Sequence, residues 1–196
     1  MISKIRASDK EESNLETNFE GMIQKNKFIS THYIVYFDQD IEGAENYREL
    51  FHVLRHATEW DVITFVLNCD GGEVDLSLQL YDNITKTLAR TRVELHKAVS
   101  AATFILLAVD EVELCIFPHV MIHAYSWGFE GKVSETAARS EFFEKQVHNT
   151  MNTIYKGFLS SKEIEACYNG KDLWLTKNEI EKRLKNFYKI RNKKNV

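Results

Sequence analysis

The stretch VITFVLNCDGG, residues 62–72, decides the fold, because an unbroken apolar run in it ends at two consecutive glycines. A continuous apolar run of this length is typical of a strand that is buried on both faces of a parallel sheet. From Val74 to Ala89 the apolar residues recur at helical spacing. We therefore predict a strand, a glycine turn and a helix. Ligand sites in such sheets gather at the carboxyl ends of strands, where Gly71 and Gly72 are expected.

The alternation of strand and helix continues on both sides of this stretch. Strands are expected at four apolar or β-branched runs, namely 33–37, 92–95, 113–117 and 120–122, the last two on either side of Pro118. Helices are expected at 44–56, 100–108, 134–159, 160–168 and 176–187. Thr176, with Glu179 three residues later, forms a capping-box pattern for the last helix. Strands that alternate with helices predict an α/β fold with largely parallel strands.

Composition narrows the class of protein. The 196 residues suffice for one domain with a full core. The formal net charge of −4 gives no overall basic field, so a nucleic-acid-binding module is not expected. No apolar run reaches the roughly 18 residues that a membrane span needs, and the polar N-terminus has no secretory signal. Three cysteines without CxxC spacing predict neither a disulfide framework nor a metal site, and they favour a reducing, cytoplasmic setting.

Three segments carry residues that could do chemistry. The Gly71–Gly72 turn could present backbone N–H groups to an oxyanion, Ser100 begins the predicted buried helix among small residues, and His123 ends an apolar strand. Each segment also has a purely structural explanation. A Gly-Gly pair is commonly a turn, a serine before a helix is commonly an N-cap, and a single histidine is commonly a satisfied core or surface residue. Taken singly, these segments therefore leave the function open.

Taken together and in order, four blocks of sequence resemble the family of Clp protease proteolytic subunits. The blocks are NCDGGEV (68–74) with LQLYDNI (78–84), KAVSAATFILLA (97–108), ELCIFPHVMIHAY (113–125) and GKDLWLTKNEI (170–180). The resemblance extends from about residue 33 to residue 184. It implies a ClpP/crotonase-like α/β fold of repeated strand-strand-helix units with a protruding handle helix.

The resemblance also implies a serine endopeptidase with a Ser–His–Asp triad. Ser100 matches the family's nucleophile, His123 its general base and Asp172 the third member of the triad. A serine hydroxyl needs such a base, because it is a weak nucleophile until its proton is removed. The aspartate would hold the imidazole in the right tautomer and stabilise the imidazolium. No metal and no cofactor is implied.

The oxyanion site that the resemblance implies consists of the backbone N–H groups of Gly71 and Ala101, supported by Gly72. Two nearby residues depart from the family's pattern. Asp70 replaces a proline and would place a negative charge beside the oxyanion, and Ala102 replaces a glycine and adds a methyl group to the nucleophile turn. These departures keep open the alternative of a catalytically weak or inactive homologue with an assembly or regulatory role.

Three regions are expected along the chain: a flexible N-terminal arm (1–27), a peptidase domain (28–188) with its handle at about 126–160, and a basic tail (189–196). The resemblance implies that the chain forms a homo-oligomer, a ring or a double ring, that encloses polypeptide substrates. It also implies a separate AAA+ ATPase unfoldase as partner. The chain has no GxxxxGK[ST] motif, so such a partner would have to supply the use of ATP.

Two further enzyme classes compete with the peptidase hypothesis. An acyl-CoA enzyme of the crotonase-like fold also uses a Gly-Gly oxyanion site, but it does not need a serine, a histidine and an aspartate together. A membrane-associated serine–lysine peptidase could pair Ser100 with Lys97, but the blocks around His123 and Asp172 argue against this pair. A Ser–His–Asp peptidase thus accounts for more of the sequence than either alternative.

Overall fold

The computed structural model describes residues 2–6, 29–126 and 130–192. The strands in these ranges are β1 (Ile2–Arg6), β2 (Thr31–Phe37), β3 (Val62–Cys69), β4 (Arg90–Val99), β5 (Glu111–Ile122) and β6 (Leu173–Leu175). The helices are η1 (Ala44–Tyr47), α1 (Arg48–His56), α2 (Val74–Lys86), α3 (Ala102–Ala108), α4 (Val133–Ile154), α5 (Ser161–Tyr168) and α6 (Lys177–Asn192), where η1 is a 3-10 helix.

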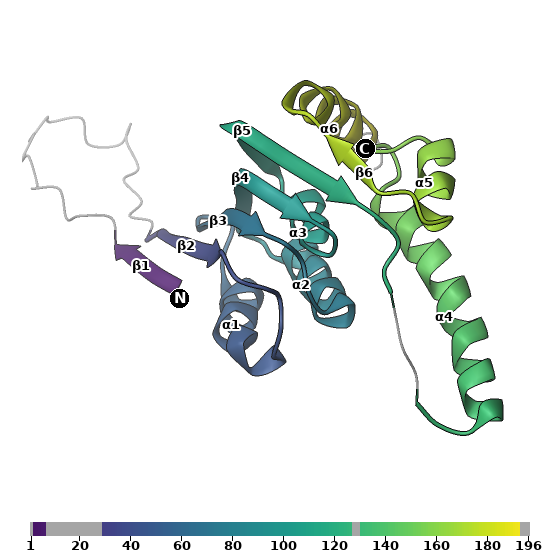
Figure 1. The fold of residues 1–196 in the computed structure, drawn as a ribbon. Helices are drawn as coiled ribbons and strands as arrows, with labels where there is room; N and C mark the ends of the chain where they lie inside the picture. The colour runs from purple at the N-terminus through teal and green to yellow at the C-terminus, as the bar shows by residue number, and fades with distance from the viewer. Residues whose placement is uncertain (1, 7–28, 127–129, 193–196) are drawn as a thin grey trace, which may run out of the picture.

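The six strands form one sheet in the order β1-β2-β3-β4-β5-β6. Neighbours from β2 to β5 run parallel, whereas β1 and β6 pair at the two edges in antiparallel orientation. Figure 1 shows α1, α2 and α3 together on one side of the strands, and it shows α4 extending away from them. The prediction of an α/β fold with largely parallel strands and a protruding helix is confirmed.

The core lies between the sheet and the helices. In β3, Ile63, Phe65 and Leu67 are fully buried, while Val62 and Val66 on the opposite face are only half-buried. Thr64, on the same face as Val62 and Val66, is buried, so the expectation of a strand buried on both faces is partly met. Helices α1 to α3 cover the other face (Figure 1). All residues of α3 are buried, as its apolar character on every side requires.

Strand β5 corrects the prediction of two separate strands around Pro118, because it runs unbroken from Glu111 to Ile122. The pairing with β4 passes from Leu95 opposite Leu114 directly to Lys97 opposite His119. Pro118 lies within the stretch that this register shift leaves without partners on β4. Proline has no N–H to donate, so a strand tolerates it where the ladder is already interrupted.

The nucleophile region also differs from the prediction. Strand β4 is longer than the expected 92–95 and reaches Val99, and α3 begins at Ala102 instead of at Ser100. The short strand β6 was not predicted. Its three residues are too few to show a periodicity, and pairing with β5 holds them.

At both ends of the chain, the structure describes only part of the predicted regions. Residues 2–6 of the expected flexible arm form β1 in the structure, and the rest of the arm to residue 27 lies outside the described residues. The expected basic tail begins within α6, which continues to Asn192, and residues 193–196 lie outside the described part. Of the predicted handle, α4 is described and residues 127–129 are not.

Candidate active site

Ser100 lies in a strained turn between β4 and α3. Its φ of 55° places it in the left-handed region, and among the described residues it is the one non-glycine residue with a positive φ. This conformation costs roughly 1–2 kcal/mol for a residue with a side chain. Hydrogen bonds hold the turn on both sides: the Ser100 N–H donates to the Met121 carbonyl at 2.9 Å, and the Thr103 hydroxyl donates to the Ser100 carbonyl at 2.6 Å.

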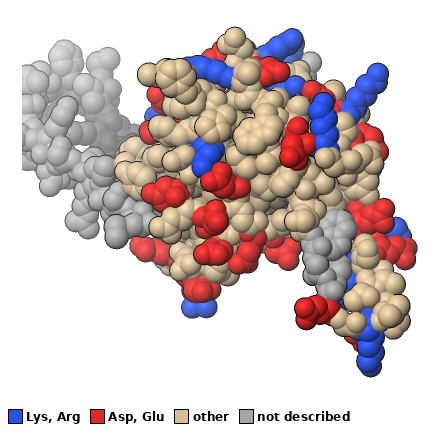
Figure 2. Space-filling model, in the orientation of Figure 1, with Lys and Arg blue, Asp and Glu red and all other residues tan. Residues whose placement is uncertain are grey.

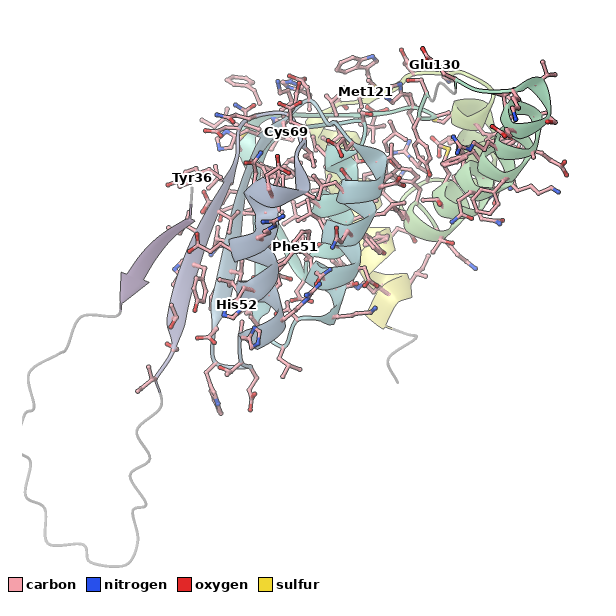
Figure 3. All side chains as sticks on the ribbon, turned by 90° about the horizontal axis from the view of Figure 1, so that it is seen from below. Tyr36, Phe51, His52, Cys69, Met121 and Glu130 are labelled. Carbon is pink, nitrogen blue, oxygen red and sulfur yellow. The ribbon has the colours of Figure 1, made fainter. Side chains whose placement is uncertain are left out.

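The position of Ser100 disagrees with the purely structural explanation of an N-cap. The residue before α3 is Ala101, and no side chain caps this helix. The strained turn leaves the Ser100 side chain partly exposed at the carboxyl edge of the sheet. Figure 3 shows Cys69 and Met121, near the ends of β3 and β5, along this same edge, with His52 at the opposite one.

His123 lies directly after β5, next to the end of β4, and contacts the serine. The distance between His123 Nε2 and Ser100 Oγ is 2.7 Å, within hydrogen-bond range. Parallel pairing of β4 with β5 produces this contact, because it brings the ends of both strands to one edge. A histidine nitrogen at this distance can take the hydroxyl proton, as a general base must.

Asp172 lies directly before β6, whose antiparallel pairing with β5 brings it to the other side of the imidazole. The distance between Asp172 Oδ1 and His123 Nδ1 is 3.8 Å, which is too long for a hydrogen bond. The Asp172 side chain is 59% exposed and that of His123 is 33% exposed. The structure thus brings all three predicted triad residues together, with a close serine–histidine contact and a looser histidine–aspartate contact.

The Gly71–Gly72 turn packs directly against the nucleophile. The φ angles of 113° and 140° are unfavourable for residues with side chains. A Cβ added at Gly71 would lie 2.9 Å from Ser100 Cβ, and one at Gly72 would lie 2.2 Å from the Ile41 carbonyl oxygen. Both positions therefore need glycine, and the close approach to Ser100 is what an oxyanion site at this turn requires.

Sequence reasoning missed the role of Cys69 beside this turn. The Gly71 N–H donates to Cys69 Sγ at 3.3 Å, and the thiol itself donates to the Gln39 carbonyl at 3.1 Å. Burial raises the pKa of the Cys69 thiol, so the group stays protonated at neutral pH. A thiol sulfur is a weak acceptor, and an oxyanion would compete well for the same N–H. The one signal in the sequence is that Cys69 belongs to the NCDGG block.

Asp70, one of the two departures from the family's pattern, forms an ion pair with Lys97. Lys97 Nζ lies 2.6 Å from Asp70 Oδ2. Pairing of Asn68 with Lys97 between β3 and β4 places the two side chains next to each other. The lysine offsets the negative charge that was expected to oppose an oxyanion. It is also engaged away from Ser100, which argues against a serine–lysine pair.

Ala102, the other departure, is fully buried at the start of α3. Its methyl group belongs to the hydrophobic core, together with Phe104 and Ile105. The nucleophile turn itself consists of Ser100 and Ala101, which keep their hydrogen bonds to Met121 and to Thr103 and Phe104. The added methyl group therefore does not disturb the turn.

A cavity of about 410 Å³ opens beside the Gly-Gly turn. Residues from the turn and α2 line one side, and residues from α4 and the segment after His123 line the other, including Gly72, Leu78, Tyr125 and Val147. No periodicity in the sequence indicated this cavity.

The described residues also bear on two other kinds of protein, metalloenzymes and membrane proteins. No group of three or more histidine, cysteine, aspartate or glutamate side chains in this part of the chain could hold a metal ion. Within the described residues, no helix is both long enough and apolar enough to cross a membrane. Figure 2 shows more acidic than basic side chains on the face in view, in line with the net charge of −4.

Comparison with known protein families identifies the family of this chain. The family model described as Clp protease matches residues 20–183, which is most of the chain. A search of curated proteins finds no similar sequence. The matched range includes the glycine turn, Ser100, His123 and Asp172.

Proposed function

The chain belongs to the Clp protease family, and from this we propose that it is a serine endopeptidase that cleaves unfolded polypeptides or peptides through Ser100, His123 and Asp172. The observation that carries the proposal is the 2.7 Å contact between Ser100 Oγ and His123 Nε2. A strained serine turn in contact with a histidine is the arrangement that an activated nucleophile needs. The alternating strands and helices of the chain are consistent with the ClpP/crotonase-like fold of this family.

The reaction begins when Ser100 Oγ attacks the carbonyl carbon of the scissile peptide bond. His123 Nε2 takes the hydroxyl proton as the new C–O bond forms, and it then gives this proton to the leaving amine as the C–N bond breaks. The acyl group remains on Ser100 as an ester. Water attacks the ester with the same histidine as base, which releases the new carboxyl terminus and restores the hydroxyl.

The oxyanion of each tetrahedral intermediate would accept hydrogen bonds from the N–H groups of Gly71 and Ala101, with Gly72 supporting the turn. Gly71 is close enough to the nucleophile for this role, since its Cα hydrogen position faces Ser100. The Gly71 N–H would exchange its weak bond to Cys69 Sγ for a stronger one to the oxyanion. Removal of one such donor typically costs roughly 2.7–4 kcal/mol of transition-state stabilisation.

We also propose a homo-oligomer, a ring or a double ring, that works with a separate AAA+ ATPase unfoldase. The support is the family and the character of α4, which extends from the body and exposes the apolar side chains of Val133 and Phe142. Apolar side chains on a protruding helix favour burial against another chain. The free cysteines, of which Cys69 and Cys167 are buried, favour a reducing, cytoplasmic setting.

One observation favours a second candidate, a catalytically weak or inactive homologue with an assembly or regulatory role. The exposed Asp172 lies 3.8 Å from His123 and makes no hydrogen bond with it. A triad whose third member is loosely held orients its histidine less well. The same fold and the same assembly would then serve without efficient hydrolysis.

Labelling with a fluorophosphonate probe, read by intact mass, tests the proposal. We expect one adduct on the wild type and none on Ser100→Ala or His123→Ala. Ser30→Ala is the matched control: Ser30 is exposed and precedes β2 at the opposite end of the sheet, so its loss should leave labelling unchanged. Absence of an adduct on the assembled wild type would contradict the peptidase proposal and support the inactive homologue.

A further inference from the structure

The cavity beside the glycine turn adjoins the reacting atoms. Gly72 lines it and directly follows Gly71, which packs on Ser100. Tyr125 lines its other side, two residues after His123. The cavity therefore opens between the proposed oxyanion site and the histidine. A substrate whose carbonyl carbon lies at Ser100 Oγ would direct a neighbouring side chain into this space, whose volume of about 410 Å³ is within the range of ligand pockets.

Part of the cavity wall, formed by α2 and α4, is apolar. Val74 and Leu78 come from α2, and Phe143 and Val147 come from α4. Val147 is fully buried and belongs to the hydrophobic core. Walls of this kind stabilise a long run of methylene groups in a substrate side chain.

Tyr125, which lines the cavity, has a buried hydroxyl. This oxygen is buried and makes no hydrogen bond of normal geometry within the described part of the chain, although the Thr150 hydroxyl lies near enough to influence it. Burial raises the pKa of Tyr125 to about 12, so the hydroxyl is neutral at physiological pH. A buried hydroxyl without a partner is unfavourable, and a polar ligand group would satisfy it.

The charges at the cavity are acidic. Asp75 and Glu73 line it, and no lysine, arginine or histidine does so among the described residues. Asp75 lies close enough to raise the pKa of Tyr125 through its charge. One oxygen of Glu73 accepts the Gly43 N–H at 3.0 Å, which leaves its negative charge in place. An anionic side chain would meet two carboxylates, and an aliphatic one would leave the Tyr125 hydroxyl unsatisfied.

We propose that this cavity is a specificity site for a long cationic side chain, lysine or arginine, on the residue that supplies the scissile carbonyl. The methylene stem would pack on Val74, Leu78 and Val147, and the charged head would lie near Asp75 with N–H groups directed to Tyr125 Oη. This inference rests on the proposed peptidase function. It makes the enzyme selective for cleavage after basic residues.

Fluorogenic peptides that differ only in the residue before the scissile bond test the inference. We expect kcat/KM to be at least about tenfold higher for arginine and lysine than for leucine, and lowest for glutamate. Asp75→Asn should lower kcat/KM for arginine about tenfold and leave the leucine peptide nearly unchanged, whereas Asp75→Glu should keep the preference for arginine. Tyr125→Phe should also reduce the arginine preference.

Asp82→Asn is the matched control, because Asp82 also lies on α2 but pairs with Lys86 at 2.7 Å and does not line the cavity. A change in selectivity in this variant would indicate a general charge effect and overturn the assignment to Asp75. Leucine cleaved as well as arginine would overturn the inference and leave the peptidase function intact. Labelling of Ser100 by the fluorophosphonate without cleavage of the basic peptides would also overturn it. Absence of both labelling and cleavage would contradict the peptidase function itself, and the inference with it.

Discussion

Of the two contacts within the triad, the one between Asp172 and His123 is the weaker. The Asp172 carboxylate lies 3.8 Å from His123 Nδ1 and is largely exposed, so solvent screens the pair. We expect Asp172→Asn to lower kcat/KM by clearly less than the roughly 10⁴-fold loss that is typical where the third member is buried and hydrogen-bonded. Steady-state kinetics with the best peptide substrate would measure the loss.

Glu165→Gln is a suitable control for Asp172→Asn, because Glu165 forms a similar exposed pair with His148 at 3.5 Å. That variant should keep full activity. A loss as large as that of His123→Ala in the Asp172 variant would show that the aspartate closes on the histidine when substrate binds, and would contradict the loose arrangement.

Gly71 provides a test of the contact between the turn and the nucleophile. Gly71→Ala should abolish fluorophosphonate labelling and lower the free energy of unfolding, because the new Cβ would lie 2.9 Å from both Ser100 Cβ and the Val99 carbonyl oxygen. Gly170→Ala isolates the backbone strain: its φ is 93°, and an added Cβ would meet no atom within 4 Å. This control should cost only about 1–2 kcal/mol and keep labelling. Equal effects of both variants in urea unfolding would contradict a specific contact at Gly71.

The site residues show what sequence could and could not predict. The resemblance of four blocks in order was enough to propose Ser100, His123 and Asp172, and the parallel pairing of β4 with β5 brings the first two to one edge of the sheet. The ion pair of Asp70 with Lys97 was not foreseen, although Asp70 had been noted as a departure. It depends on the pairing register of β3 with β4, which hydrophobic pattern alone does not determine to one residue.

Two elements, α5 and α6, hold the segment that carries Asp172. Arg183 on α6 donates to both carboxylate oxygens of Glu163 on α5, at 2.6 and 3.0 Å. Glu163 also accepts the Ser160 N–H at 2.9 Å in the capping box of α5. These bonds connect α5 with α6, the two helices on either side of the loop and short strand that carry Asp172.

The pH dependence of stability follows from Glu163. Hydrogen bonds from Arg183, with those from Ser160, lower the pKa of this carboxyl from 4.5 to about 2. A pKa that is lower in the folded state stabilises the fold above the unfolded value, and this contribution is lost as the pH falls toward 2. We expect Glu163→Gln to be less stable than wild type at pH 7, with a difference that shrinks between about pH 4.5 and pH 2. Urea unfolding at several pH values would measure it.

Glu141→Gln is the matched control for this prediction. Glu141 also pairs with a basic side chain, Lys145 at 2.7 Å, but both side chains are more than two-thirds exposed. An exposed pair within one helix contributes little, so the control should unfold like the wild type. A difference between wild type and Glu163→Gln that stays constant down to pH 2 would contradict the assigned role of the charge.

At the scale of elements, periodicity predicted helices and buried strands well and strand ends poorly. The continuity of β5 through Pro118 depends on a gap in the ladder with β4, and the length of β4 depends on its neighbours on both sides. Strand β6 forms through antiparallel pairing with the free edge of β5. Such features arise from pairing between segments that are distant in the sequence. A periodicity read over a short stretch of sequence therefore cannot predict them.

At the scale of the whole molecule, the apolar side chains of α4 make assembly testable. Val133 and Phe142 are 85% and 61% exposed, and they lie on the helix that extends from the body. We expect Phe142→Glu to shift the protein to smaller species in sedimentation velocity, because a buried carboxylate at an interface is unfavourable. Leu88→Glu, which changes an exposed leucine between α2 and β4, should sediment like wild type. A monomeric wild type, or an unchanged Phe142 variant, would contradict assembly through α4.

The left-handed turn at Ser100 also bears on how such a chain would evolve if its activity were no longer selected. At φ 55° glycine is free of the strain that serine carries, so drift toward a more stable protein favours glycine or asparagine at this position. If the activity were lost, we therefore expect substitutions at position 100 to appear before substitutions in the hydrophobic core. A descendant that served only for assembly would keep α3 and α4 and replace Ser100 early. The serine that this chain retains in a strained turn is what continued use of its hydroxyl would preserve.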